Sequence, residues 1–317
     1  MVKVALFGSS GLLGSAISKE LDKRSFEVIK YHRSQESGER HADLKRINLM
    51  DHEHLIRELF DIWPDAIVNC AAISSPDQVD QDPELANKIN VKAAQKLAEI
   101  AGHLGSRYIH ISSDMVFSGR KRPYRSTDQP NPLSEYGRQK LNAEKRILSS
   151  LDDNFVVLRV TLLNGNSPKG NRSPHERILR SLKDNQPIRL YDNEFRQPCS
   201  SENVASVIVE LLERPNLNGL FHWAGSEIIT RYDLGLKIME RFGLNSGKII
   251  RASLSDQNNA KVRRPDHLAF ELNPLVGKLK TQPTNIAMQL DGLKIPNDLY
   301  QWYRENAEDP SKYIFRL

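Results

Sequence analysis

The chain has 317 residues, of which 39% are hydrophobic and 27% are charged. These values are typical of a folded, water-soluble protein and exclude a disordered, collagen-like or small disulfide-rich chain. The net charge of +5, from 45 basic and 40 acidic residues, is modest for this length and does not argue for a nucleic-acid partner.

The two cysteines, Cys70 and Cys199, are far apart and form no CxxC motif, so the sequence predicts no disulfide framework and no metal site. Glycines interrupt the apolar N-terminal stretch, which predicts a strand, a turn and a helix rather than a signal peptide. No run approaches the roughly 18 apolar residues that a membrane helix requires. We therefore expect a cytoplasmic protein with no membrane partner.

Short apolar runs alternate with helical patterns over the first 160 residues. A helix is predicted to begin at Asp82-Pro83-Glu84 and to run past Asn90 toward Ala101. Repeated strand-helix-strand order predicts an α/β fold with a doubly wound parallel sheet. The strands are expected at residues 2–7, 26–31, 66–70, 108–112 and 155–160.

The alternation ends in a turn-rich stretch at residues 164–170. We therefore predict a nucleotide-binding domain over residues 1–163 and a smaller, mainly substrate-binding lobe over 164–317, with about 188–222 returning to the first sheet. Later helices are expected at residues 204–213 and 231–242, and an irregular tail over 256–296.

Gly8, Gly11 and Gly14 follow the first predicted strand and open the first helix. This placement favours a Rossmann-type dinucleotide site over a purely structural turn, because the backbone can approach a pyrophosphate at a helix N-terminus. The second strand ends in Lys30-Tyr31-His32-Arg33-Ser34, without a carboxylate for a ribose 2′-hydroxyl. Arg33 and Ser34 suit a 2′-phosphate, so NADP is preferred and NADH stays open; the alternative is a solvated basic turn.

Tyr136 and Lys140 are four residues apart and share a helix face, so the Lys140 ammonium is expected to lower the pKa of the Tyr136 phenol toward neutrality. Ser113 ends a strand and is placed to hydrogen-bond the same substrate oxygen. Such a pair is often a surface contact, but together with the glycine motif it favours catalysis.

These residues resemble the extended short-chain dehydrogenase/reductases, within them the dTDP-4-dehydrorhamnose reductase-like branch. The likeness rests on Asn69-Cys-Ala-Ala72, Ile89-Asn90-Val91, the Ile111–Gly119 strand end and above all the stretch from Pro123 to Lys140. It implies that Ser113, Tyr136 and Lys140 are catalytic in an NADPH-dependent reduction of a 4-keto-deoxysugar carried on a nucleotide. The cofactor residues it implies are Gly8, Ser10, Gly11, Leu12, Leu13, Arg33, Ser34, Asn48, Leu49, Cys70, Ala71, Ala72, Asn90, Tyr136 and Lys140.

For the substrate, the resemblance implies Ser113, Asp114, Val116 and Tyr136. Arg196 lies in a segment similar to the family's pocket loop, where it is placed to clamp a phosphate; the alternative is a solvated basic loop. Two other functions stay open: a non-catalytic NADP-binding subunit similar to that of methionine adenosyltransferase, and a sugar-nucleotide epimerase. A homodimer through helices of the first domain is compatible with the sequence.

Overall fold

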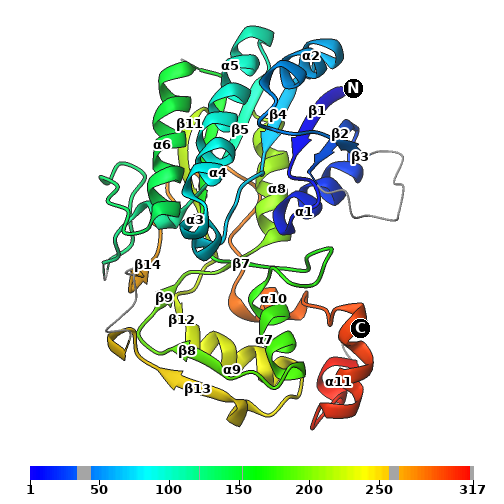
Figure 1. The fold of residues 1–317 in the computed structure, drawn as a ribbon, viewed down its shortest axis with the longest axis vertical. Coiled ribbons are helices and arrows are strands. Elements are labelled where there is room, and N and C mark those ends of the chain that lie inside the picture. The colour runs from blue at the N-terminus through cyan, green and yellow to red at the C-terminus, as the bar shows by residue number, and fades with distance from the viewer. Residues whose placement is uncertain (34–43, 121, 152, 257–263, 315–317) are drawn as a thin grey trace.

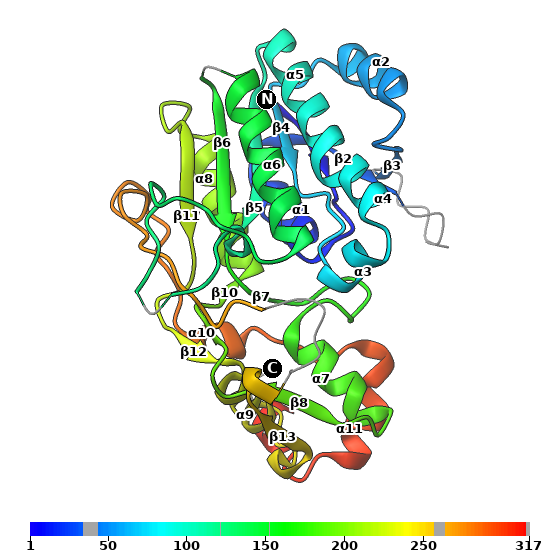
Figure 2. The ribbon, with the colours of Figure 1, turned by 60° about the vertical axis from the view of Figure 1, so that its left-hand side comes forward.

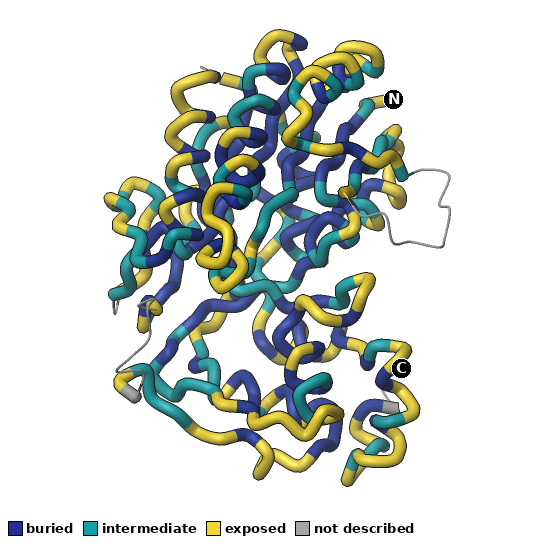
Figure 3. Tube along the Cα trace, in the orientation of Figure 1, coloured by how far each residue is buried: buried dark blue, intermediate teal, exposed yellow. Residues whose placement is uncertain are grey.

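The computed structural model describes residues 1–33, 44–120, 122–151, 153–256 and 264–314. It has two lobes, a larger one built on a parallel sheet and a smaller one of short strands and helices (Figure 1). Figure 3 shows buried residues along the strands of the large sheet and exposed residues on the outer sides of its helices. The fold is the Rossmann-type α/β arrangement that the alternating pattern predicts.

The large sheet has seven strands in the order β11-β6-β5-β4-β1-β2-β3, all paired in parallel. The strand order reverses at β1: β2 and β3 continue on one side of it, and the chain then returns to place β4 on its other side. The carboxyl ends of strands at such a reversal point form the usual ligand crevice of this fold. The strands are β1 (Val2–Phe7), β2 (Phe26–His32), β3 (Leu44–Arg46), β4 (Ala66–Asn69), β5 (Arg107–Ser113), β6 (Phe155–Val160) and β11 (Gly219–Trp223).

Helices cover both faces of this sheet (Figure 2). Helices α1 (Leu12–Asp22) and α8 (Ser201–Leu212) share one apolar core with the strands, and α2 (His52–Ile62), α5 (Ala94–Leu104) and α6 (Glu135–Ser150) share the other. Two short helices, α3 (Pro76–Gln81) and α4 (Pro83–Asn87), precede a π-helical turn, Lys88–Ala93, that leads into α5.

The predicted helix start is confirmed, because Asp82 accepts a hydrogen bond from the Leu85 amide at 2.9 Å and Pro83 occupies the first turn. The prediction of an irregular tail is only partly right, since α10 (Ile286–Asp291) lies inside it with its own Asn285 cap. Of the segment 188–222, α8 and β11 lie with the large sheet. The start of that segment does not, because β8 (Ile188–Tyr191) and β9 (Phe195–Arg196) pair in the smaller lobe.

The smaller lobe has its own apolar core. Three short sheets lie outside the large sheet and pair β10 with β7, β9 with both β12 and β14, and β13 with β8. The remaining elements are β7 (Leu163–Asn164), β10 (Cys199–Ser200), β12 (Ile229–Thr230), β13 (Ile249–Ala252), β14 (His267–Leu268), α7 (Pro174–Lys183), α9 (Arg231–Arg241), α11 (Tyr300–Asn306) and α12 (Ser311–Ile314).

Candidate active site

The glycine loop after β1 is a tight cradle at the strand-order reversal. Gly8 has φ +80°, and a Cβ there would lie 2.7 Å from the Ala71 amide nitrogen. A Cβ on Gly14 would overlap the Gly8 carbonyl oxygen, so α1 packs this close only with glycine. The Gly8 amide donates to the Tyr31 carbonyl at 3.1 Å, which ties the loop to β2.

The N-terminus of α1 is free of a side-chain cap. Gly11 occupies the N-cap position, and the first turn of the helix contains no acidic residue. Ser10 is exposed beside it, whereas the Leu13 side chain is buried in the core, so only the backbone of Leu13 is available to a ligand. An uncapped helix end with its positive dipole fits a pyrophosphate.

Basic and polar residues follow β2 and β3 at the same edge of the sheet. Arg33 directly follows β2 and is exposed; Ser34 lies outside the described residues. Asn48 is exposed and accepts the Met50 amide at 3.1 Å, while Leu49 packs against the core. Arg33 and Asn48 are thus accessible near the cradle, and Leu49 is partly buried.

The loop after β4 is held by two buried asparagines. Asn69 accepts the Ala71 amide at 3.0 Å, and Asn90, on the π-helical turn, accepts the Ile73 amide at 2.9 Å and donates to its carbonyl at 3.1 Å. Cys70 and Ala72 are partly exposed on this loop. The predicted residues of this loop therefore lie beside the glycine cradle, with Asn90 supporting the loop.

The end of β5 brings Ser113 and Tyr136 together. Ser113 donates to the Asp114 carboxylate at 3.1 Å, and its hydroxyl lies close enough to Tyr136 to lower the pKa of that phenol. Helix α6 can pack this close to the turn only because Gly137 has no Cβ. A Cβ there would overlap the Met115 carbonyl oxygen. The sequence analysis did not single out Gly137, although its place directly after Tyr136 is a signal that could have identified it.

Two predicted substrate residues of this turn are buried. Val116 is 0% exposed, and its side chain packs inside a small apolar cluster. Burial raises the pKa of Asp114 to about 6.

The predicted effect of Lys140 on the Tyr136 phenol is wrong for this chain. Burial raises the pKa of Tyr136 to about 12, partly offset by the hydrogen bond with Ser113. Lys140 shares the buried face of α6, but its Nζ donates to the Ile111 carbonyl and lies 3.2 Å from His110 Nε2. Burial also lowers the pKa of Lys140 to about 8. The Nζ of Lys140 is therefore turned toward β5.

A buried ion pair underlies this face of α6. Glu144 receives two hydrogen bonds from Arg159 on β6, at 2.9 and 2.6 Å, and one from Ser112. Both side chains are at most 3% exposed. Bidentate pairing of this kind fixes the helix against the sheet.

Arg196 is not a free phosphate clamp. Its guanidinium donates to the carbonyls of Phe195 and Pro265 at 2.7 and 2.9 Å and pairs with Glu194 at 2.9 Å. The side chain is 7% exposed. Its charge nevertheless lowers the pKa of both Asp114 and Arg231, so it lies near both side chains.

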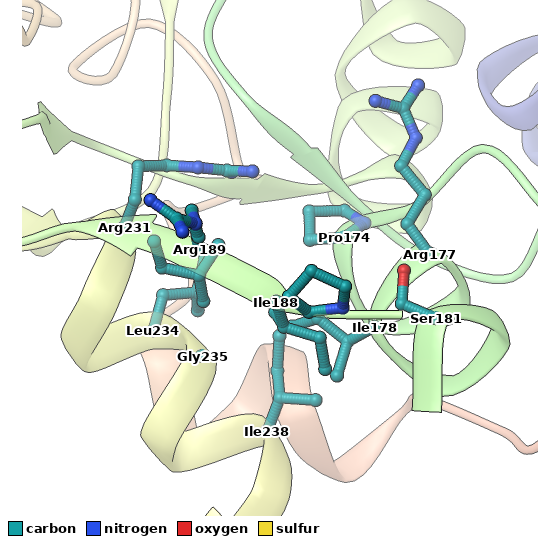
Figure 4. Close-up of a pocket in the computed structure, with 12 residues that line it drawn as sticks. Pro174, Arg177, Ile178, Ser181, Ile188, Arg189, Arg231, Leu234, Gly235 and Ile238 are labelled. Atoms are coloured by element: carbon teal, nitrogen blue, oxygen red, sulfur yellow. The ribbon is translucent and has the colours of Figure 1, made fainter. Parts of the chain in front are cut away.

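The smaller lobe holds a basic pocket that the sequence analysis missed. Arg177, Arg189 and Arg231 line a cavity of about 220 Å³ and come from α7, β8 and α9 (Figure 4). Its apolar lining includes Ile188 and Leu234. These residues are far apart in sequence and meet only through the packing of the smaller lobe.

Arg231 is an incompletely partnered charge in this pocket. Its Nη1 is buried, with no hydrogen-bond partner in the described part of the chain. Burial lowers its pKa to about 10; Glu194 opposes this effect, while Arg196, Arg177 and Arg264 add to it. An arginine in such surroundings fits an anionic ligand.

Within the described ranges, no group of three or more His, Cys, Asp or Glu side chains is placed to hold a metal ion. None of their helices is long and apolar enough to cross a membrane.

The parallel sheet and the active-site geometry define an extended short-chain dehydrogenase/reductase fold. The chain belongs to the family described as the RmlD substrate binding domain, whose model matches residues 2–292.

Named relatives fall into two functional groups. The chain is 33% identical over 254 residues to methionine adenosyltransferase 2 subunit beta of Xenopus laevis, covering 78% of this chain and 74% of that protein. It is 28% identical over 284 residues to a probable low-salt glycan biosynthesis reductase of Haloferax volcanii, covering 87% and 92%. The crystal structure of a hypothetical dTDP-4-dehydrorhamnose reductase from Sulfolobus tokodaii matches with a TM-score of 0.79 and 29% identity, covering 93% and 100%.

Proposed function

We propose that this chain is an NADPH-dependent reductase of a 4-keto-deoxysugar carried on a nucleotide. The observation that carries the proposal is the proximity of the Ser113 and Tyr136 hydroxyls at the carboxyl end of β5, beside the glycine cradle. Relatives named as reductases share the family and the fold. When bound, the reduced nicotinamide supplies a hydride.

The chain's own residues supply the proton and hold the reacting oxygen. The high pKa of Tyr136 keeps its phenol protonated at neutral pH, which is the form that ketone reduction needs. The Ser113 hydroxyl, beside it, would hold the carbonyl oxygen. Lys140 would bind the ribose of the nicotinamide and bring positive charge toward Tyr136.

The cofactor would occupy the cradle of Gly8 and Gly11, with its pyrophosphate at the N-terminus of α1. Arg33 would bind a 2′-phosphate, which is the basis for preferring NADP. The nucleotide part of the substrate would extend past Arg196 to the basic pocket around Arg231. An apolar floor under arginines suits a base with attached phosphates.

The proposal is tested by following NADPH absorbance after addition of a 4-keto-6-deoxy nucleotide sugar, with NADH in parallel. Steady oxidation that depends on the sugar supports the reductase. If the cofactor stays bound, no NADPH is consumed and the configuration at a sugar carbon inverts, the chain is an epimerase and the reductase proposal is wrong.

A second candidate function is that of a cofactor-binding regulatory subunit, favoured by the 33% identity to subunit beta of methionine adenosyltransferase 2. The test is co-purification with a methionine adenosyltransferase from the same organism. A stable complex without reduction of any keto sugar would favour this function.

A further inference from the structure

A buried histidine contacts the proposed catalytic lysine. His110 lies on β5, is 1% exposed, and places Nε2 3.2 Å from Lys140 Nζ. Neither the cradle nor the Ser113–Tyr136 pair requires a titratable group at this position. The presence of a buried histidine beside Lys140 therefore needs a separate explanation.

The hydrogen bonds around Asn69 assign the proton on His110. Asn69 Oδ1 accepts the Ala71 amide at 3.0 Å, so its NH₂ group faces Tyr108 Oη at 3.3 Å and His110 Nδ1 at 3.4 Å. The Tyr108 hydroxyl donates to the Ala94 carbonyl at 3.0 Å and so accepts from Asn69. His110 Nδ1 is likewise faced by a donor, so a neutral ring carries its proton on Nε2.

This tautomer constrains Lys140. A protonated Nε2 is a donor, and it forms a hydrogen bond with Nζ only when the amine of Lys140 is neutral and offers its lone pair. An ammonium has donors alone, so it must leave Nε2 or force the proton of His110 to Nδ1, which breaks the bond from Asn69.

The charges around the pair agree with this reading. Burial and the Lys140 charge hold the pKa of His110 well below its usual value, so the ring stays neutral. Burial lowers the pKa of Lys140 to about 8, while Glu144 on α6 and Cys70 after β4 oppose that shift. Cys70 is itself held as a thiol, because burial raises its pKa to about 12. Glu144 is engaged by Arg159.

We propose that His110 is a positioning residue that couples its own tautomer to the charge of Lys140. The neutral amine is held against β5 by Nε2–H, and protonation of Lys140 moves the His110 proton to Nδ1 and breaks the bond from Asn69. The coupling is a property of the chain without cofactor; only its catalytic consequence rests on the proposed reductase function.

The direct test reads the tautomer by long-range ¹H–¹⁵N spectra of histidine-labelled, cofactor-free protein, on both sides of pH 8. The His110 signals are assigned by their loss in His110→Gln. We expect an Nε2–H pattern at alkaline pH that changes as Lys140 gains its proton while the ring stays neutral. In Lys140→Met the Nε2–H pattern should persist at every pH. An Nδ1–H pattern throughout, or a wild-type pattern as constant as that of Lys140→Met, would overturn the proposal.

The kinetic test uses two substitutions and the reductase assay. His110→Leu removes both ring nitrogens, whereas His110→Gln keeps an acceptor toward Asn69 and a donor toward Lys140. We expect the basic limb of the pH–rate profile to move up by about one pH unit in His110→Leu and to stay in place in His110→Gln. A merely structural role would lower the rate or stability without moving the limb. If the chain reduces no keto sugar, the tautomer measurement still decides the coupling.

Discussion

Two buried arginines, one in each lobe, differ in how completely their guanidinium groups are paired. In the larger lobe, Arg159 is buried and fully engaged by Glu144, with His222 3.3 Å away. In the smaller lobe, Arg231 has a buried nitrogen with no partner in the described ranges and several arginines close by. A buried arginine that is paired with a carboxylate holds the packed elements together, whereas a buried arginine without a full set of partners lowers stability. The difference indicates that the first arginine supports the fold, and it agrees with the proposal that the second serves a ligand.

The largest effect is expected from breaking the paired charge. Glu144→Gln leaves the Arg159 guanidinium buried and uncompensated, and should lower the free energy of unfolding by about 3–5 kcal/mol. Denaturant unfolding measures this change. The matched control is Glu135→Gln on the same helix, whose pair with the half-exposed Arg138 should be worth less than about 1 kcal/mol. Equal effects in the two variants would refute the structural role of the buried pair.

The next largest effect concerns the proton donor. Tyr136→Phe removes the phenolic proton at the end of β5 and should lower turnover about a hundredfold or more. NADPH binding should be retained, because the cradle is untouched; fluorescence titration checks this. Tyr300→Phe, on the surface helix α11, is the control and should leave turnover unchanged. Normal turnover in Tyr136→Phe would eliminate Tyr136 as the acid.

A smaller effect is expected from the unbalanced charge. Arg231→Met should raise KM for the nucleotide sugar about tenfold to a hundredfold with little change in kcat, because the contact lies away from the reacting carbonyl. Its thermal midpoint should not fall, since the guanidinium lacks a full set of partners. Arg304→Met, on exposed α11, serves as the control. A clear loss of stability with unchanged KM would reverse the comparison between the lobes.

The smallest effect is expected at the cofactor's 2′-phosphate. Arg33→Ala should weaken NADPH binding about tenfold, because one exposed charge-assisted contact is lost. NADH binding in the same variant is the internal control and should stay within twofold, about the precision of the titration. Parallel losses for both cofactors would assign Arg33 to the fold of the loop instead.

The larger lobe was predictable because its signals are local. A strand, a glycine turn and a helix follow one another within residues 2–22, and Tyr136 and Lys140 share one helix turn. The pocket around Arg231 could not be predicted, since α7, β8 and α9 meet only through the tertiary packing of the smaller lobe. Arg196 was misjudged because a sequence does not show that Glu194 and two carbonyls would enclose it.

The pKa of Tyr136 was misjudged for a related reason. Helical spacing places Lys140 on the same face, but it does not show that His110 and the Ile111 carbonyl would hold its Nζ. Burial of the phenol therefore sets the direction of its pKa. Helical spacing predicts which face of the helix a side chain lies on, but it does not predict which groups that side chain contacts.

The central claim is that Tyr136 and Ser113 protonate and hold a keto-sugar oxygen during reduction by NADPH. The most direct measurement is NADPH consumption with a 4-keto-6-deoxy nucleotide sugar, run on the wild-type chain and on Tyr136→Phe at equal cofactor occupancy. The account predicts steady consumption by the wild type and about a hundredfold less by the variant. Equal rates in the two proteins, or no consumption by a wild type that binds both NADPH and the sugar nucleotide, would contradict it.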